Sequence, residues 1–151
     1  LYRASVRELK TQQNLVFKVR RYDMNLWCEP ESITAGTGGT VAFSLRAGEA
    51  FAGRNYLLVG GVSGTSPGTL LPGGQVTIPL NRDWFTDFVL SNLNHATFSS
   101  FFGTLDGSGG AEAWLNAPPI PSWAGRTVHF AFATLGPYDF ASIPVALEIE
   151  Q

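Results

Sequence analysis

Glycine and proline interrupt this chain so often that a long helix has no room to form. The 151 residues include 17 glycines and 9 prolines, against only 10 lysines and arginines. Glycine and proline destabilise the interior of a helix and favour tight turns. Between these interruptions, apolar and polar residues alternate with the two-residue period of a strand that buries one face. The sequence therefore predicts an all-β protein built from short strands.

The alternation is clearest where Val41, Phe43 and Leu45 fall on one face of a predicted strand. Residues 76–80, 128–132 and 143–149 repeat the pattern, and residues 56–59 form a continuous apolar run that favours a strand buried on both faces. For residues 85–90, a strand and a short helix both remain open. The spacing of the turn signals predicts an antiparallel β-sandwich, jelly-roll or immunoglobulin-like, with roughly eight or nine strands.

A glycine-rich stretch at residues 106–110 predicts a turn between two strands. The side chain of Asp106 is expected to cap this turn through its own oxygen. Cys28 is the single cysteine, so an internal disulfide is impossible. Burial as a reduced thiol, or a bridge to another chain, are the two roles left for it.

Charge divides the chain into two parts. Residues 1–22 carry six basic side chains and one acidic side chain, Glu8, for a net charge of +5. The remaining residues hold four basic and eleven acidic groups, for a net charge of −7. We therefore predict a basic N-terminal arm, residues 1–22, followed by a sandwich domain, residues 23–151. An interaction arm and an ordinary solvated first strand are both compatible with this asymmetry.

The arm ends in a strand-like pattern, in which Leu15, Phe17 and Val19 share one face. The residues predicted to contact another subunit are Leu15, Phe17, Lys18, Val19, Arg20, Arg21 and Tyr22. Fully extended, 22 residues reach roughly 70 Å, whereas a compact body of this size is about 35–40 Å across. The arm can therefore pack on its own domain, or leave it and add a strand to a neighbouring subunit.

From residue 32 onward the chain resembles a C-terminal accessory β-domain of large secreted proteins from planctomycetes and myxobacteria-like bacteria. The motifs that carry the resemblance, in order, are ITAGTGGT (33–40), AGRNYLLVG (52–60), SGTSPG (63–68), PLN (79–81), GTLDGSG (103–109) and FASIPVAL (140–147). They span about three quarters of the chain. The resemblance implies a domain without established activity, appended to other modules. This chain departs from that pattern because a basic arm precedes the domain, which favours a stand-alone or assembled subunit.

A search for catalytic and metal-binding residues yields no candidate. Residues 64–68 match the G-x-S-x-G pattern of serine hydrolases, but that motif needs a helix after the serine and a donor N–H at the next residue. Pro67 has no N–H, so we interpret the segment as a turn. His95 and His129 lie in a polar loop and on a strand face, without ligand spacing. We therefore expect no catalytic residue, no metal and no cofactor.

Aromatic residues offer the remaining candidate for ligand binding. Trp84 and Trp123 have polar or proline neighbours, which makes them the tryptophans expected at a surface where a polysaccharide could stack. Nucleic acid is an unlikely partner because the arm is only moderately basic and the body is acidic. No apolar run approaches the roughly 20 residues of a membrane-spanning helix. Low charge and abundant glycine, threonine and aromatic residues favour a secreted location.

Three hypotheses of function follow. The leading one is a non-enzymatic structural subunit of an extracellular assembly, such as a filament, tube or surface layer, in which the arm contacts or complements a neighbouring copy. The first alternative is a carbohydrate-binding accessory module. The second is a viral-type jelly-roll coat protein with a basic internal arm.

Overall fold

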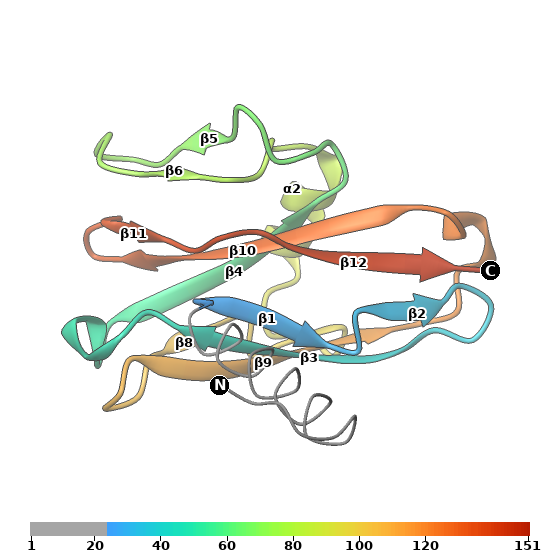
Figure 1. Ribbon diagram of the computed structural model, residues 1–151, viewed down its shortest axis with the longest axis horizontal. Helices are drawn as coiled ribbons and strands as arrows, with labels where there is room; N and C mark the ends of the chain where they lie inside the picture. Colours follow the sequence, from blue (N-terminus) through green and yellow to red (C-terminus); the bar gives the residue numbers. More distant parts are fainter. Residues whose placement is uncertain (1–23) are drawn as a thin grey trace, which may run out of the picture.

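The computed structural model describes residues 24–151. Two β-sheets packed face to face form the main body of these residues (Figure 1). The first sheet has the strand order β1 (Leu26–Glu29), β3 (Gly39–Arg46), β9 (Gly110–Ala117) and β7 (Phe98–Ser99). The second has the order β2 (Ser32–Thr34), β12 (Val145–Glu150), β10 (Thr127–Leu135), β4 (Asn55–Gly61) and β8 (Phe102–Thr104), and β11 (Phe140–Ala141) also pairs with β10. This is the all-β sandwich expected from the sequence. The predicted arm lies outside the described residues.

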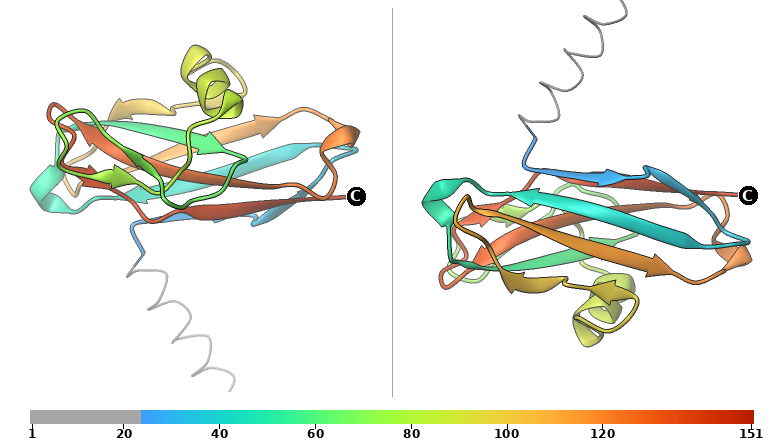
Figure 2. Two further views of the ribbon diagram at one scale, coloured as in Figure 1. Left: turned by 90° about the horizontal axis from the view of Figure 1, so that it is seen from above. Right: turned by 90° about the horizontal axis from the view of Figure 1, so that it is seen from below.

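The remaining elements lie outside the two sheets. They are the hairpin of β5 (Thr69–Leu70) and β6 (Thr77–Ile78), the helix α2 (Trp84–Ser91), and the short 3₁₀ helices η1 (Glu49–Phe51) and η2 (Pro121–Trp123). The hairpin and α2 rise above the sandwich as one excursion of the chain between β4 and β7 (Figures 1 and 2). For residues 85–90 the sequence left a strand and a short helix open, and the structure shows that they belong to the helix α2.

The predicted number of strands is wrong, because residues 24–151 contain twelve strands and not eight or nine. Four of the twelve, β5, β6, β7 and β11, have only two residues each. Two residues cannot show an alternating pattern, so strands of this length leave no periodic signal in the sequence. The strands β7 and β11 pair with the longer strands β9 and β10, whereas β5 and β6 pair only with each other.

Both sides of the sandwich are formed by segments that pass from one sheet to the other. On one side, the chain leaves β1 in the first sheet and enters β2 in the second, where β2 runs parallel to β12. On the other side, it leaves β7 and enters β8 through Ser100, whose φ of 60° turns the backbone. The Tyr56 hydroxyl donates a hydrogen bond to the Ser100 carbonyl at 2.7 Å and so holds this corner. Each sheet therefore ends in a short strand, which limits unpaired edges.

The turn predicted at residues 106–110 is confirmed. The Asp106 Oδ1 atom accepts hydrogen bonds from the backbone N–H groups of Ser108 and Gly110, at 2.8 and 3.0 Å. The flanking strands do not pair with each other: β8 belongs to the second sheet and β9 to the first. The turn therefore carries the chain between sheets, which its local sequence does not reveal.

Aromatic rings fill the space between the sheets. Phe43 of β3 and Phe130 of β10 are both fully buried, and their ring centroids lie 4.8 Å apart. Phe101 meets these two rings at 5.9 and 6.2 Å. The predicted inward face of residues 41–45 is confirmed, because Val41, Phe43 and Leu45 are at most 1% exposed. Cys28 also lies in this core.

The strand β4 is buried on both faces, as its apolar run predicts. Its Tyr56 and Leu58 point into the core, while Val59 of the opposite face is only 6% exposed. That outer face lies under the excursion between β4 and β7. There Val59 lines a pocket together with Ile78 and Leu80. The excursion thus gives the second sheet a partial third layer.

The contact between Phe43 and Phe130 predicts the response to truncation. The variant Phe43→Ala should lower the free energy of unfolding by about 3–5 kcal/mol, because it opens a cavity between the sheets that neither sheet can close. Phe102→Ala is the matched control, since Phe102 is 39% exposed, and should cost less than about 1 kcal/mol. Urea denaturation followed by fluorescence measures both. Equal losses in the two variants would contradict the central role of this contact.

Candidate functional site

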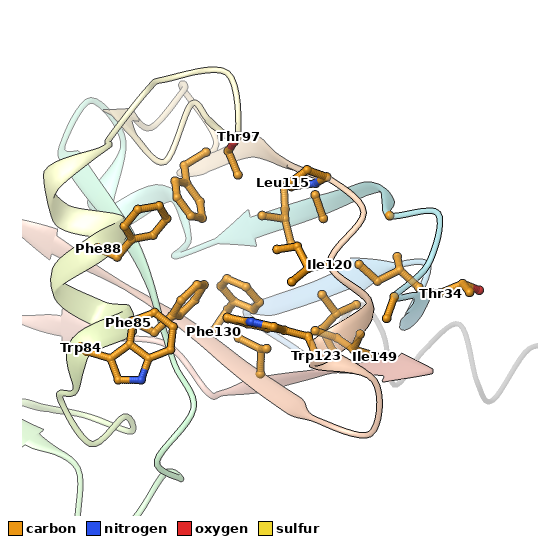
Figure 3. Close-up of a pocket in the computed structure, with 18 residues that line it drawn as sticks. Thr34, Trp84, Phe85, Phe88, Thr97, Leu115, Ile120, Trp123, Phe130 and Ile149 are labelled. Carbon is orange, nitrogen blue, oxygen red and sulfur yellow. The ribbon is translucent and has the colours of Figure 1, made fainter. Parts of the chain in front are cut away.

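An apolar cavity of about 370 Å³ opens beside α2, at the end of the sandwich where β3 begins and β12 ends (Figure 3). Both sheets, α2 and η2 contribute to its wall. Its principal lining residues are Ile33, Phe85, Phe88, Phe98, Leu115, Trp123, Phe130 and Ile149. The cavity is continuous with the hydrophobic core, because Phe130 borders both. Its lining is almost entirely apolar.

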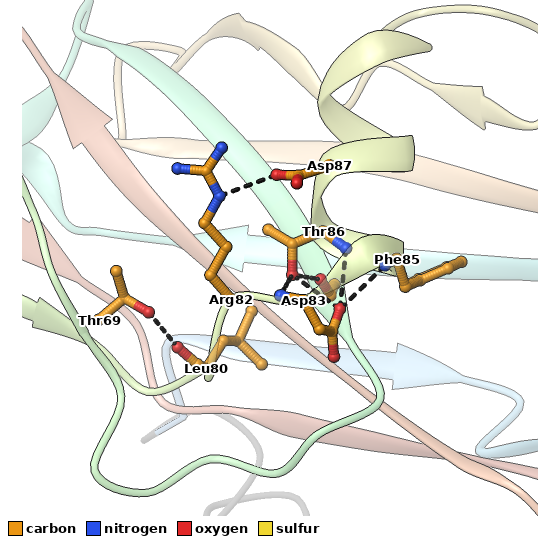
Figure 4. A network of polar contacts seen from close by, with 8 residues as sticks. Thr69, Leu80, Arg82, Asp83, Phe85, Thr86 and Asp87 are labelled. Carbon is orange, nitrogen blue, oxygen red and sulfur yellow. Dashed lines mark hydrogen bonds and ion pairs between the residues drawn. The ribbon is translucent and has the colours of Figure 1, made fainter.

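A side-chain cap fixes the helix that forms one wall of this cavity. The Asp83 Oδ1 atom accepts hydrogen bonds from the backbone N–H groups of Phe85 and Thr86, both at 3.0 Å (Figure 4). In return, the Thr86 hydroxyl accepts a hydrogen bond from the Asp83 N–H at 3.2 Å. This reciprocal pair is a capping box, with threonine in the place that usually holds glutamate or glutamine.

The same two residues attach the helix to the second sheet. The Thr86 hydroxyl donates a hydrogen bond to the Gly60 carbonyl of β4 at 2.7 Å, and the second Asp83 oxygen accepts one from the Val62 N–H at 2.8 Å. Burial raises the pKa of Asp83, but hydrogen bonds from Ser63, Thr86 and Val62 outweigh it, so that the pKa lies below its usual value. The carboxylate is therefore charged where it caps the helix.

Gly60 lets the helix approach the strand closely. A Cβ atom at this position would lie 2.9 Å from the rings of both Phe130 and Phe85. No side chain larger than hydrogen fits between these rings, so glycine is required for α2 to lie against β4. Phe85 then extends the core cluster, with its ring 6.4 Å from Phe130 and 6.2 Å from Phe98.

Two exposed aromatic residues of α2 form the rim. Trp84 is 57% exposed and Phe88 is 49% exposed. The Trp84 ring stands edge-on to Trp123 of η2, with centroids 5.8 Å apart and an interplanar angle of 85°. The Arg126 guanidinium lies 5.3 Å from the Trp123 ring centroid. The rim therefore offers apolar contact and ring edges instead of paired hydrogen-bonding groups.

The structure brings together the two tryptophans that the sequence singled out as a ligand surface, Trp84 and Trp123. Sequence reasoning missed Phe85, Phe88 and Ile33, which also line the cavity. One signal was available, because Asp83 followed by Thr86 resembles a helix start. The predicted subunit-contact residues, Leu15 to Tyr22, lie outside the described residues.

The G-x-S-x-G segment is a loop, as interpreted from Pro67. The Asn81 side chain binds it through the carbonyl oxygens of Ser63 and Ser66, both at 2.9 Å, and accepts a hydrogen bond from the Gly68 N–H. The strand β5 follows the loop, so Ser66 does not precede a helix. Two of the motifs noted in the sequence, 63–68 and 79–81, thus fold against each other.

The other polar groups with shifted pKa values serve the fold. The Arg54 guanidinium pairs with Asp139 at 2.9 Å and holds the pKa of that carboxyl below its usual value. The Gly110 N–H does the same for Asp106. His95 is exposed and His129 is half-buried. Within residues 24–151, no three His, Cys, Asp or Glu side chains gather as a metal-binding group.

Comparisons with known proteins add no family. No protein-family model, no curated protein and no solved structure matches this chain. The resemblance to an accessory domain of secreted proteins therefore stays a prediction. Among the described residues, no helix has the length and apolar character that crossing a bilayer requires.

The cap at Asp83 predicts a pH-dependent contribution to stability. Because the folded state lowers the pKa of Asp83 below its usual value of 3.8, its stabilising effect is complete above that value and is lost as the pH falls through the folded pKa. Asp83→Ala should cost about 1 kcal/mol at pH 6, and clearly less at pH 2–3.

Urea denaturation of both proteins across pH 2–7 measures this difference. Asp87→Ala is the matched control, since Asp87 lies on the same turn and pairs with exposed Arg82. It should change the free energy of unfolding by less than about 0.5 kcal/mol. A cost of Asp83→Ala that does not vary with pH would contradict the role of the charged cap.

Proposed function

We propose that this chain is a non-enzymatic structural subunit of an extracellular assembly, such as a filament, tube or surface layer. In this assembly the N-terminal segment of one copy contacts a neighbouring copy. The observation that carries the proposal is the unfilled apolar cavity beside α2. It is an extension of the core that the described residues leave open to solvent.

The chemistry of the cavity gives a physical reason for an occupant. Its walls are almost entirely apolar and stay in contact with solvent. Covering apolar surface gains roughly 25 cal/mol for each Å² removed from water. Water gains little from apolar walls, since it needs two or more polar partners in such a site. Apolar groups from another chain would gain much of this energy.

The distribution of charge supports association between copies. Residues 1–22 carry a net charge of +5, and the rest of the chain carries −7. Opposite charges on the arm and the body attract at long range and steer the encounter of two subunits. The same charges disfavour the alternative of a nucleic-acid-binding coat protein, because an acidic body repels phosphate.

The strand order supports an immunoglobulin-like sandwich as the finer description of the fold. The order β1-β3-β9-β7 corresponds to the A-B-E-D sheet of such domains, and β4, β10 and β12 take the places of strands C, F and G. The fold alone does not define a function, since it carries many. It is nevertheless a common architecture of cell-surface domains, which fits an extracellular role.

The carbohydrate-binding alternative has less support from the predicted ligand surface. Sugar rings stack on flat aromatic faces, whereas Trp84 and Trp123 stand nearly perpendicular to each other. No charged side chain lines the cavity, and its only polar side chains are two threonines and the two indoles. A sugar buried there would leave most of its hydroxyl groups unpaired, which is costly.

Removing the arm tests the proposal. The full chain should form particles larger than a monomer at tens of micromolar, and a chain lacking residues 1–22 should be a monomer, because the contact between copies is gone. Analytical ultracentrifugation over a range of concentrations gives both masses. A far-ultraviolet circular dichroism spectrum that is unchanged by the truncation shows that the sandwich still folds.

A shorter deletion is the matched control. Removing residues 1–10 takes away three of the six basic side chains and leaves residues 15–22 in place. This variant should still assemble if the apolar face of the arm makes the contact. A full chain that is monomeric at every concentration, or a chain lacking residues 1–22 that assembles as before, would overturn the proposal.

A further inference from the structure

We infer that the apolar face of the N-terminal segment, residues Leu15, Phe17 and Val19, fills the cavity beside α2 of a second copy, with Phe17 as its anchor. This inference rests on the proposed function and names the surface that the segment contacts. Three features of the molecule support this contact: the chemistry of the cavity, the reach of the chain and the charges around the cavity.

The cavity favours an apolar occupant whose orientation is determined by groups outside the cavity wall. Sites for small molecules usually combine an apolar wall with a few polar groups that fix the ligand's orientation. Here the wall holds no charged side chain, and its only polar side chains are those of Thr34 and Thr97 and the two indoles. A side chain carried by a peptide needs no such groups, because the backbone on which it sits determines its orientation.

The segment offers the matching shape. In an extended chain, residues 15, 17 and 19 point to the same face, and the first and last are separated by roughly 13 Å. The central ring of Phe17 can meet the ring edges of Trp123 and Phe85, which line the cavity. Lys18 and Arg20 then point away from the cavity and remain in water.

The reach of the chain favours a second copy over the chain's own cavity. The described chain starts beside Leu26, which pairs with Leu45, whereas the cavity lies at the Gly39–Ala117 end of the same strands. This offset is roughly 20 Å along the sheet, and the strands from β1 to β7 add roughly 14 Å across it. The straight distance is therefore about 25 Å, through the body of the protein.

The seven residue-to-residue steps from Val19 to Leu26 span at most about 25 Å when fully extended. That length equals the straight-line distance from Leu26 to the cavity, but the chain must pass around the sandwich. Figure 2 shows the start of β1 and the helix α2 on opposite sides of the body. The segment of the same chain would need full extension with no length to spare, so the reach favours an occupant from another copy.

Charges near the cavity suit the basic segment. Glu148 and Glu150 are exposed on β12, where they alternate with Leu147 and Ile149 of the cavity wall. Asp87 is exposed on α2 between the rim residues. Arg82, which pairs with Asp87, and Arg126, which is stacked on Trp123, are the basic groups on this side. The three acidic groups outnumber these two and attract Lys18, Arg20 and Arg21.

A complementation experiment with full-length chains tests the inference. Phe17→Ser removes the anchor and leaves the cavity intact, while Ala117→Phe fills the cavity and leaves the segment intact. Each variant alone should be a monomer, with self-association weakened roughly thirtyfold or more. An equal mixture should form a one-to-one dimer, because the intact segment of the Ala117→Phe chain can bind the intact cavity of the Phe17→Ser chain. Val16→Ser, which changes the opposite face, is the matched control and should assemble normally.

Sedimentation of each variant and of the mixture gives the masses, and near-ultraviolet circular dichroism verifies the fold. If Ala117→Phe does not fold, Thr97→Phe fills the same cavity from another wall. Assembly of the filled variant, together with loss of assembly in the chain lacking residues 1–22, would overturn the inference and leave the proposed function standing. Assembly of the chain lacking residues 1–22 would overturn both.

Discussion

The contact between Phe43 and Phe130 holds the two sheets of this sandwich together. Each ring stands at the middle of a long central strand, and Phe101 packs against both of them. A single cysteine, itself buried, provides no disulfide between the sheets. The sheets therefore depend chiefly on apolar burial, and ring pairs of this geometry add to the energy of burial. Everything else in the fold is arranged around this cluster of phenylalanines.

The helix α2 depends on that cluster and in turn determines the cavity. Phe85 can join the rings only because Gly60 leaves room on β4, and Asp83 and Thr86 tie the first turn of the helix to the end of the same strand. With its first turn fixed, the helix presents Trp84 and Phe88 outward. The opening of the core is therefore held by a set of specific contacts, which distinguishes it from a gap left by loose packing.

Patterns with a regular period could be predicted from the sequence, and contacts between distant segments could not. The inward face of residues 41–45 and the turn capped by Asp106 follow from local spacing and local side-chain chemistry. The two-residue strands and the change of sheet at Ser100 depend on partners elsewhere in the chain. The polar and proline neighbours of Trp84 and Trp123 predict surface positions for both residues. The contact between the two rings, however, depends on the packing of α2 beside η2. No local pattern contains that information.

The geometry of the proposed contact also constrains the kind of assembly that it would build. A segment of one copy and a cavity of the next are different surfaces, so the interface is heterologous, and such interfaces produce rings or open filaments instead of twofold dimers. The described residues begin near the start of β1, on the side opposite α2 (Figure 2). Donor and acceptor surfaces on opposite sides place successive copies in a row. Closure into a ring would require a bend at each contact, so this arrangement favours an open filament.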